Sequence, residues 1–169
     1  MKKRTIVLLL AVISLFIYSC QKKDITPKEN ACPAPQKSQA VIESNRNGGG
    51  PYVLNMVIQL SGDDEVPAVN TPTKGLAHLR VSSDKKLYSK VIIQNLADGD
   101  VLRFAHVHAG ATGVNGPIKI FLCHTAEDFG ENIVTDLTDE EYNLLLNDAT
   151  YVNAHSNFSP PGLVRGQIR

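Results

Sequence analysis

The chain lacks the short motifs that identify several enzyme classes. It has no glycine-rich loop able to cradle a phosphate, no Gly-x-Ser-x-Gly nucleophile turn and no Cys-x-x-Cys pair. Acidic residues are plentiful, but none form a spaced pair that singles out general acid–base chemistry. These absences favour a non-enzymatic protein and predict no catalytic residue, without deciding the question.

An excess of positive charge is absent as well. The sequence has 17 basic and 17 acidic residues. Removal of a leader that contains Lys2, Lys3 and Arg4 would leave an acidic excess of three. Because nucleic-acid binding requires a basic surface, we expect no nucleic-acid partner.

The sequence also has no apolar run of the roughly 20 residues that a membrane-spanning helix needs. Its longest such run, residues 6–17, follows three basic residues, in the order of a secretory signal. Ile17-Tyr18-Ser19-Cys20 resembles a lipobox, although Tyr18 is bulkier than usual. We therefore expect a lipoprotein with a signal peptide over residues 1–19 and lipid such as palmitate on Cys20. The alternatives are an ordinary signal peptide and an uncleaved anchor.

The lipoprotein prediction implies that the protein is exported to the bacterial cell envelope. There its lipid would anchor it to a membrane, and the outer membrane is favoured. Residues 20–50 are polar, rich in proline and glycine and without periodicity, which predicts a flexible linker. Residues 51–169 then form one domain of ordinary size. Cys32 lies in the linker and Cys123 in an apolar run, so Cys123 is expected to be a buried small hydrophobe. Whether Cys32 and Cys123 form a disulfide stays undecided at this point.

From Tyr52 onward, apolar and polar residues alternate with a period of two, which indicates β-strands. Turn sequences separate the strands, a spacing typical of an antiparallel sandwich or barrel. Thr138 and Glu141 form a capping box that predicts one short helix over about 139–147, packed across an open end of the sandwich. The predicted strands are residues 52–60, 77–81, 87–95, 102–108, 118–123, 150–155 and 163–168.

Three histidines are candidate metal ligands. His106 and His108 are two residues apart, so a strand places both imidazoles on one face, about 6.6 Å apart along the chain. His155 could add a third ligand if its strand is a neighbour, and three histidines on a β-scaffold suit Zn or Cu. The competing interpretation is that these histidines form ordinary hydrogen bonds at a sheet edge or loop mouth.

Glu65 and Arg165 form a second candidate, a structural or binding polar cluster. Glu65 follows a turn, and Arg165 lies on the polar side of the last strand, opposite Val164 and Gly166. A Glu65–Arg165 pair would clamp distant parts of the chain together. If merely exposed, it would contribute only about 0–1 kcal/mol.

Several motifs, in order along the chain, resemble the CHRD domain, a family named for repeats in chordin. These are Leu60-Ser61-Gly62, Glu65-Val66-Pro67, Gly75-Leu76-Ala77, Ala105-His106-Val107-His108-Ala109-Gly110, Gly116-Pro117-Ile118, Tyr151-Val152-Asn153-Ala154-His155 and Pro161-Gly162-Leu163-Val164-Arg165-Gly166-Gln167-Ile168. The resemblance runs from about Met56 to the C-terminus. Two departures are Asn147-Asp148, where the family commonly has glycine, and Leu163, which replaces a usual acidic residue beside Arg165.

The resemblance implies an all-β protein, a small antiparallel immunoglobulin-like β-sandwich, but it implies no reaction. The His-x-His pair is similar to the first copper-ligand pair of the copper/zinc superoxide dismutases, whose fold is also a β-sandwich. The bridging histidine, zinc-ligand cluster and disulfide of those enzymes are not evident. We therefore expect a non-enzymatic binding or structural module without cofactor, with an unknown protein or small-ligand partner. The alternative is a metal-binding domain, possibly redox-active, that uses His106, His108 and His155 to hold Zn or Cu.

Overall fold

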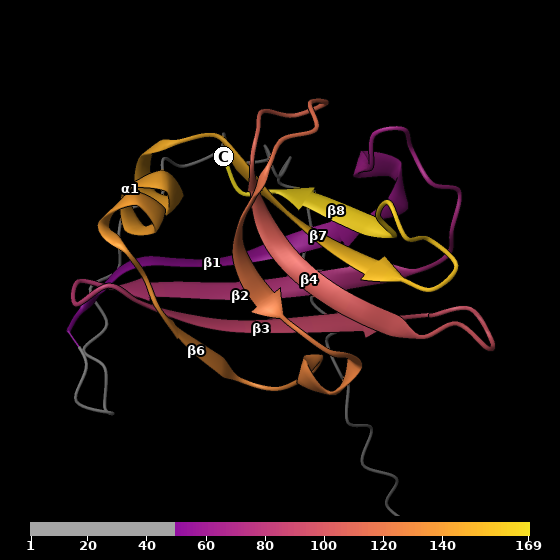
Figure 1. Ribbon diagram of the computed structural model, residues 1–169, viewed down its shortest axis with the longest axis horizontal. Helices are drawn as coiled ribbons and strands as arrows, with labels where there is room; N and C mark the ends of the chain where they lie inside the picture. Colours follow the sequence, from indigo (N-terminus) through magenta and orange to yellow (C-terminus); the bar gives the residue numbers. More distant parts are fainter. Residues whose placement is uncertain (1–49) are drawn as a thin grey trace, which may run out of the picture. The chain divides into compact units, whose positions relative to one another are not determined.

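The computed structural model describes residues 50–169, which contain eight strands and one α-helix (Figure 1). The predicted signal peptide, Cys20, Cys32 and nearly all of the predicted linker lie outside the described residues. Within them, no helix is long and apolar enough to cross a membrane. The strands are β1 (Tyr52–Ser61), β2 (Lys74–Ser82), β3 (Lys86–Gln94), β4 (Leu102–Ala109), β5 (Ile118–Cys123), β6 (Ile133–Asp136), β7 (Thr150–Ser156) and β8 (Val164–Gln167).

The sheet has the strand order β5-β4-β7-β8-β1-β2-β3-β6, and its neighbouring strands pair antiparallel. Only one pair of residues, Ser61 and Arg165, joins β8 to β1 in register. The sheet therefore divides at this point into two four-stranded layers that enclose the core (Figure 1). The predicted all-β antiparallel fold is confirmed.

The core lies where the alternating pattern predicts it. Ala77, Leu79 and Val81 of β2 are fully buried and face the second layer, which supplies Val107 and Val152. Burying apolar surface contributes about 25 cal/mol per Å², so this interior dominates the stability of the fold. Cys123 is a free thiol within it, and burial raises the pKa of that thiol to about 12. Its predicted place as a buried small hydrophobe is confirmed.

The predicted helix forms as α1 (Asp139–Asn147). The backbone N–H of Glu141 donates to Thr138 Oγ1 at 3.2 Å, and the N–H of Thr138 donates to Glu141 Oε2 at 2.8 Å, which completes the capping box. Leu145 is fully buried in the core, while Tyr142 packs partly against it. The helix thus lies at one end of the layers, as the sequence indicates (Figure 1).

β6 was not predicted, since it has only four residues and its side chains alternate between half-buried and exposed. It pairs with β3 at the edge of the sheet. Such a short edge strand has too few buried positions to give a period-two pattern.

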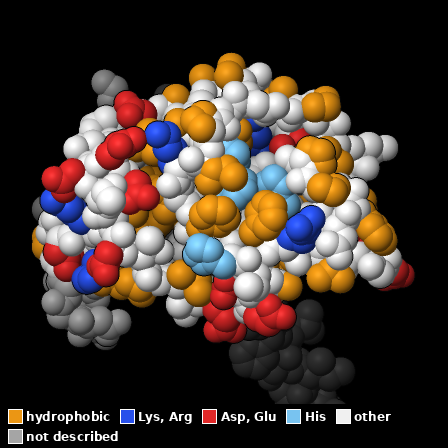
Figure 2. Space-filling view, viewed as in Figure 1, with side chains coloured by type: hydrophobic (Ala, Val, Ile, Leu, Met, Phe, Trp, Pro, Cys, Tyr) orange, Lys and Arg blue, Asp and Glu red, His pale blue; other side chains and the backbone are white. Residues whose placement is uncertain are grey.

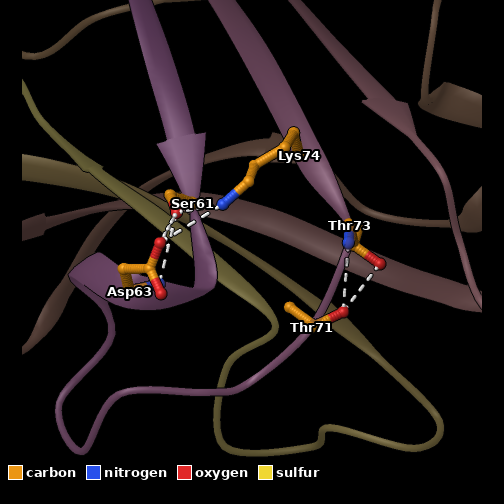
Figure 3. A network of polar contacts seen from close by, with 5 residues as sticks. All are labelled: Ser61, Asp63, Thr71, Thr73 and Lys74. Atoms are coloured by element: carbon orange, nitrogen blue, oxygen red, sulfur yellow. Dashed lines mark hydrogen bonds and ion pairs between the residues drawn. The ribbon is translucent and has the colours of Figure 1, made fainter.

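The connection from β1 to β2 is held at both ends by polar contacts (Figure 3). Lys74 Nζ donates to Ser61 Oγ at 2.6 Å and lies 3.4 Å from Asp63 Oδ2. Further along, Thr73 donates its backbone N–H to Thr71 Oγ1. This connection contains Glu65, which lies between Asp63 and Thr71 in the sequence.

Candidate metal centre

Two adjacent strands place four polar side chains on one face. His106 and His108 come from β4, and Asn153 and His155 from β7, each pair two residues apart. In the ladder between these strands, His106 lies directly opposite Asn153. Because side chains alternate across a strand, the intervening Val107 and Ala154 point into the core.

The three predicted histidines converge. One ligand nitrogen from each of His106, His108 and His155 lies within 4.8 Å of the others. Two nitrogens on one tetrahedral zinc ion are about 3.4 Å apart, given Zn–N distances near 2.1 Å. The nitrogens would therefore have to approach one another by up to about 1.4 Å to share one ion. Figure 2 shows the histidine side chains gathered near the middle of one face and bordered by apolar side chains.

Hydrogen bonds to backbone carbonyls orient two of the rings. His108 Nδ1 lies 2.7 Å from the carbonyl oxygen of Gly116, and His155 Nδ1 lies 2.8 Å from that of Pro160. A carbonyl oxygen can only accept, so Nδ1 carries the proton in both rings. In the neutral rings Nε2 then has a free electron pair. Metal-binding histidines typically have this second-shell support.

His106 has no such support. Its ring is almost completely buried, and neither Nδ1 nor Nε2 has a hydrogen-bond partner among the described residues. A buried polar group left unpaired costs about 1–3 kcal/mol. Burial, together with the charges of His108 and His155, lowers the pKa of His106 to about 3. The ring is therefore neutral and keeps an electron pair available for a ligand.

Aromatic rings hold the histidines from the sides. Phe104 stacks on His106, with centroids 5.4 Å apart, and lies 4.7 Å from His155. Tyr151 stacks on His108 at 4.6 Å with the rings nearly parallel. These contacts enclose the three imidazoles between aromatic side chains.

Glu65 and Arg165 are both buried beside this cluster, but no ion pair joins them in the part of the chain that the structure describes. Glu65 Oε1 instead accepts from Asn153 Nδ2 at 3.3 Å. Desolvation raises the pKa of the Glu65 carboxyl to about 7, against the lowering effects of Asn153 and Arg165. The two side chains border a common hollow of about 260 Å³.

The guanidinium of Arg165 has other partners. Its Nη2 donates to the carbonyls of Ala111 and Val114, and its carbon lies 3.4 Å from the centroid of the Tyr151 ring. Arg165 therefore fastens the loop between β4 and β5, which also supplies the Gly116 carbonyl to His108. Arg165 thus holds this loop, and the predicted clamp by a Glu65–Arg165 ion pair does not form among the described residues.

The sequence model of the CHRD domain family matches residues 56–168, which include all the side chains described above. The chain belongs to the CHRD domain family. The predicted resemblance is thereby confirmed, and nearly the whole described part of the protein is this CHRD domain. No curated protein and no solved structure matches the chain significantly.

Sequence reasoning missed Asn153, although a signal for it was present. Asn153-Ala154-His155 on β7 has the same spacing as His106-Val107-His108 on β4. Two such triplets on paired strands place four polar side chains together. The strand pairing needed to connect them is not encoded in either triplet.

Proposed function

We propose that this CHRD domain is a non-enzymatic metal-binding module that holds one Zn or Cu ion on His106, His108 and His155. The observation that carries the proposal is the unpartnered pair of ring nitrogens on buried His106, beside two oriented imidazoles. Folding a chain around an unsatisfied polar group is unfavourable unless something else provides the missing partner. A metal ion would provide it for the ring nitrogen that carries the free electron pair.

The chemistry of the donors supports a first-row transition ion. Imidazole nitrogen is a ligand of intermediate softness that suits Zn and Cu. Burial lowers the pKa of His108 and of His155 as well as that of His106, so the ligands are already unprotonated at neutral pH. Metal binding then requires no proton release from the rings, which favours affinity.

The test is metal content, measured by elemental analysis of the full chain purified without tag or chelator. We expect about one ion per chain in the wild type and none in the His106→Ala/His108→Ala double variant. His78→Ala, which removes a histidine of β2 outside the cluster, is the matched control and should keep the ion. A wild type that stays metal-free after addition of Zn²⁺ or Cu²⁺ would contradict the proposal. It would favour a module for a protein or small-ligand partner, with the histidines as buried polar packing.

We further propose that the domain is displayed from a bacterial membrane by lipid on Cys20. The support is the order of basic residues, apolar run and lipobox-like sequence before that cysteine. Two or more acyl chains are needed for a stable tether, because one chain binds a membrane only marginally. Labelling with a palmitate analogue should mark the wild type and the control Cys32→Ser in the membrane fraction. Cys20→Ser should be unlabelled and released, and a labelled Cys20→Ser variant would contradict lipidation there.

A further inference from the structure

The carboxamide of Asn153 lies between two of the proposed ligands. Its Oδ1 is 2.6 Å from His155 Nε2 and 3.3 Å from His108 Nε2. Both distances are in the range of a hydrogen bond, and the closer pair would have to separate to share one ion, whose ligand atoms lie about 3.4 Å apart. Asn153 also lies directly opposite His106 in the strand ladder. The oxygen therefore lies between two of the three histidines, on the strand next to the third.

No proton is available for these two contacts in the neutral cluster. The Gly116 and Pro160 carbonyls fix the ring proton of His108 and of His155 on Nδ1, so both Nε2 atoms carry electron pairs. An amide oxygen also offers only electron pairs. Three acceptors that face one another repel. A cation between them removes the conflict.

The amide nitrogen of Asn153 has a partner on the other side. Asn153 Nδ2 donates to Glu65 Oε1 at 3.3 Å, and Glu65 is 8% exposed. Turning the amide over would direct Nδ2 at the two ring nitrogens, but it would also place Oδ1 against an oxygen of the Glu65 carboxyl group. In the structure the amide oxygen is directed at the histidines and the amide nitrogen at Glu65.

From this geometry we propose that Asn153 Oδ1 is the fourth ligand, that the site has three nitrogens and one oxygen, and that Glu65 is a positioning residue for the amide. The inference rests on the proposed metal site and deepens it. An amide oxygen is a hard, neutral donor, so the site selects a divalent ion, Zn²⁺ or Cu²⁺, over Cu⁺. The four donors come from β4 and β7 and would complete a tetrahedral set, while the Glu65 carboxylate supports the amide from outside it.

The test uses the full chain at pH 8.5, where the Glu65 carboxyl is ionised, and compares Asn153→Leu with Asn153→Asp. Zn²⁺ affinity is measured by competition with a chromophoric chelator, and the coordination sphere is followed by the d–d absorption of bound Co²⁺. We expect Asn153→Leu to lose about 100-fold in affinity, at the upper end of what loss of a supporting group costs. Asn153→Asp keeps an oxygen donor and adds charge, so it should bind at least as tightly and shift the Co²⁺ bands. Thermal unfolding in chelator shows whether each variant folds, and Asn153→Ala replaces Asn153→Leu if the latter does not.

The role of Glu65 is tested with a second matched pair. Glu65→Gln keeps an oxygen that can accept from Asn153 Nδ2 and should retain the affinity and the Co²⁺ spectrum. Glu65→Leu removes the acceptor, so its affinity should fall about tenfold with a changed spectrum. An equal effect of the two substitutions would overturn the positioning role.

The outcomes separate this inference from the proposed function. If the wild type binds one ion and both Asn153 variants match its affinity and spectrum, Asn153 is not a ligand, while the histidine site stands. If the wild type binds none of Zn²⁺, Co²⁺ and Cu²⁺, the histidine site and the fourth ligand are both excluded. Tighter binding of Cu⁺ than of Cu²⁺ would overturn the selection of a divalent ion by an oxygen donor.

Discussion

The two faces of β7 are both buried, yet they have opposite character. Val152 and Ala154 on the inner face are in contact with apolar neighbours from both layers. Tyr151, Asn153 and His155 on the outer face are equally removed from solvent but lie among polar groups with specific partners. Burial therefore does not distinguish a core from a site, whereas the satisfaction of hydrogen bonds does.

The comparison also separates what each face tolerates. An apolar core accepts other apolar side chains of similar volume, because dispersion and hydrophobic contacts have no direction. A buried polar cluster depends on donor and acceptor pairing, and one missing partner costs as much as a lost hydrogen bond. His106 is the point where this pairing is incomplete.

The largest effect is expected on the inner face. Val107→Asp places an unpaired carboxylate in the core between two unchanged histidines, and should destabilise the domain by about 4 kcal/mol or more. Urea unfolding in the presence of chelator measures this loss. A variant as stable as the wild type would mean that Val107 does not face the core.

Removal of Arg165 tests the outer face. Arg165→Ala leaves the Ala111 and Val114 carbonyls without their buried donor and frees the loop that orients His108. We expect about 3 kcal/mol of lost stability and weaker metal binding. Arg165→Lys, with one ammonium in place of the planar fork, should recover part of each. A variant that loses stability but keeps its metal affinity would exclude a role of this loop in orienting His108.

The raised pKa of the Glu65 carboxyl predicts that the free energy of unfolding of the metal-free protein depends on pH. Its pKa rises from 4.5 to about 7 on folding, so the unfolded chain loses its proton first. The contribution of this group to stability is complete below pH 4.5 and is lost as the pH rises to about 7, with an upper limit of about 3 kcal/mol. Glu65→Gln should abolish this decline, measured as the difference in unfolding free energy from wild type between pH 4.5 and 8.5. A difference that does not change with pH would contradict the raised pKa.

The smallest effect has the opposite sign. His106→Phe replaces an unpartnered polar ring by an apolar one among aromatic neighbours, so the metal-free domain should gain about 1 kcal/mol. The same substitution should abolish metal binding. Calorimetric unfolding in chelator and a Zn²⁺ titration check the two halves. Lower stability of the metal-free variant would show that His106 has a stabilising partner in the folded protein.

Much of the fold follows from local patterns. The alternation in β1 and β2 and the capping box at Thr138 each lie within one segment, and the structure contains the elements that they predict. β6 escaped prediction because four partly buried residues carry too little pattern. The same-face placement of His106 and His108 was also predictable, since it depends only on the period of a strand.

The sequence by itself determined the elements, their apolar faces and the pairing of two histidines on one face, because each depends on residues a few positions apart. Tertiary structure decided that β7 lies beside β4, and so that His155 and Asn153 meet the first two histidines. It also decided which ring nitrogen of His108 and His155 is free, since the carbonyls that settle this belong to Gly116 and Pro160 in separate loops. The pairing of two strands that are distant in the sequence has no short-range signature, and the candidate site depends on the pairing of β4 with β7.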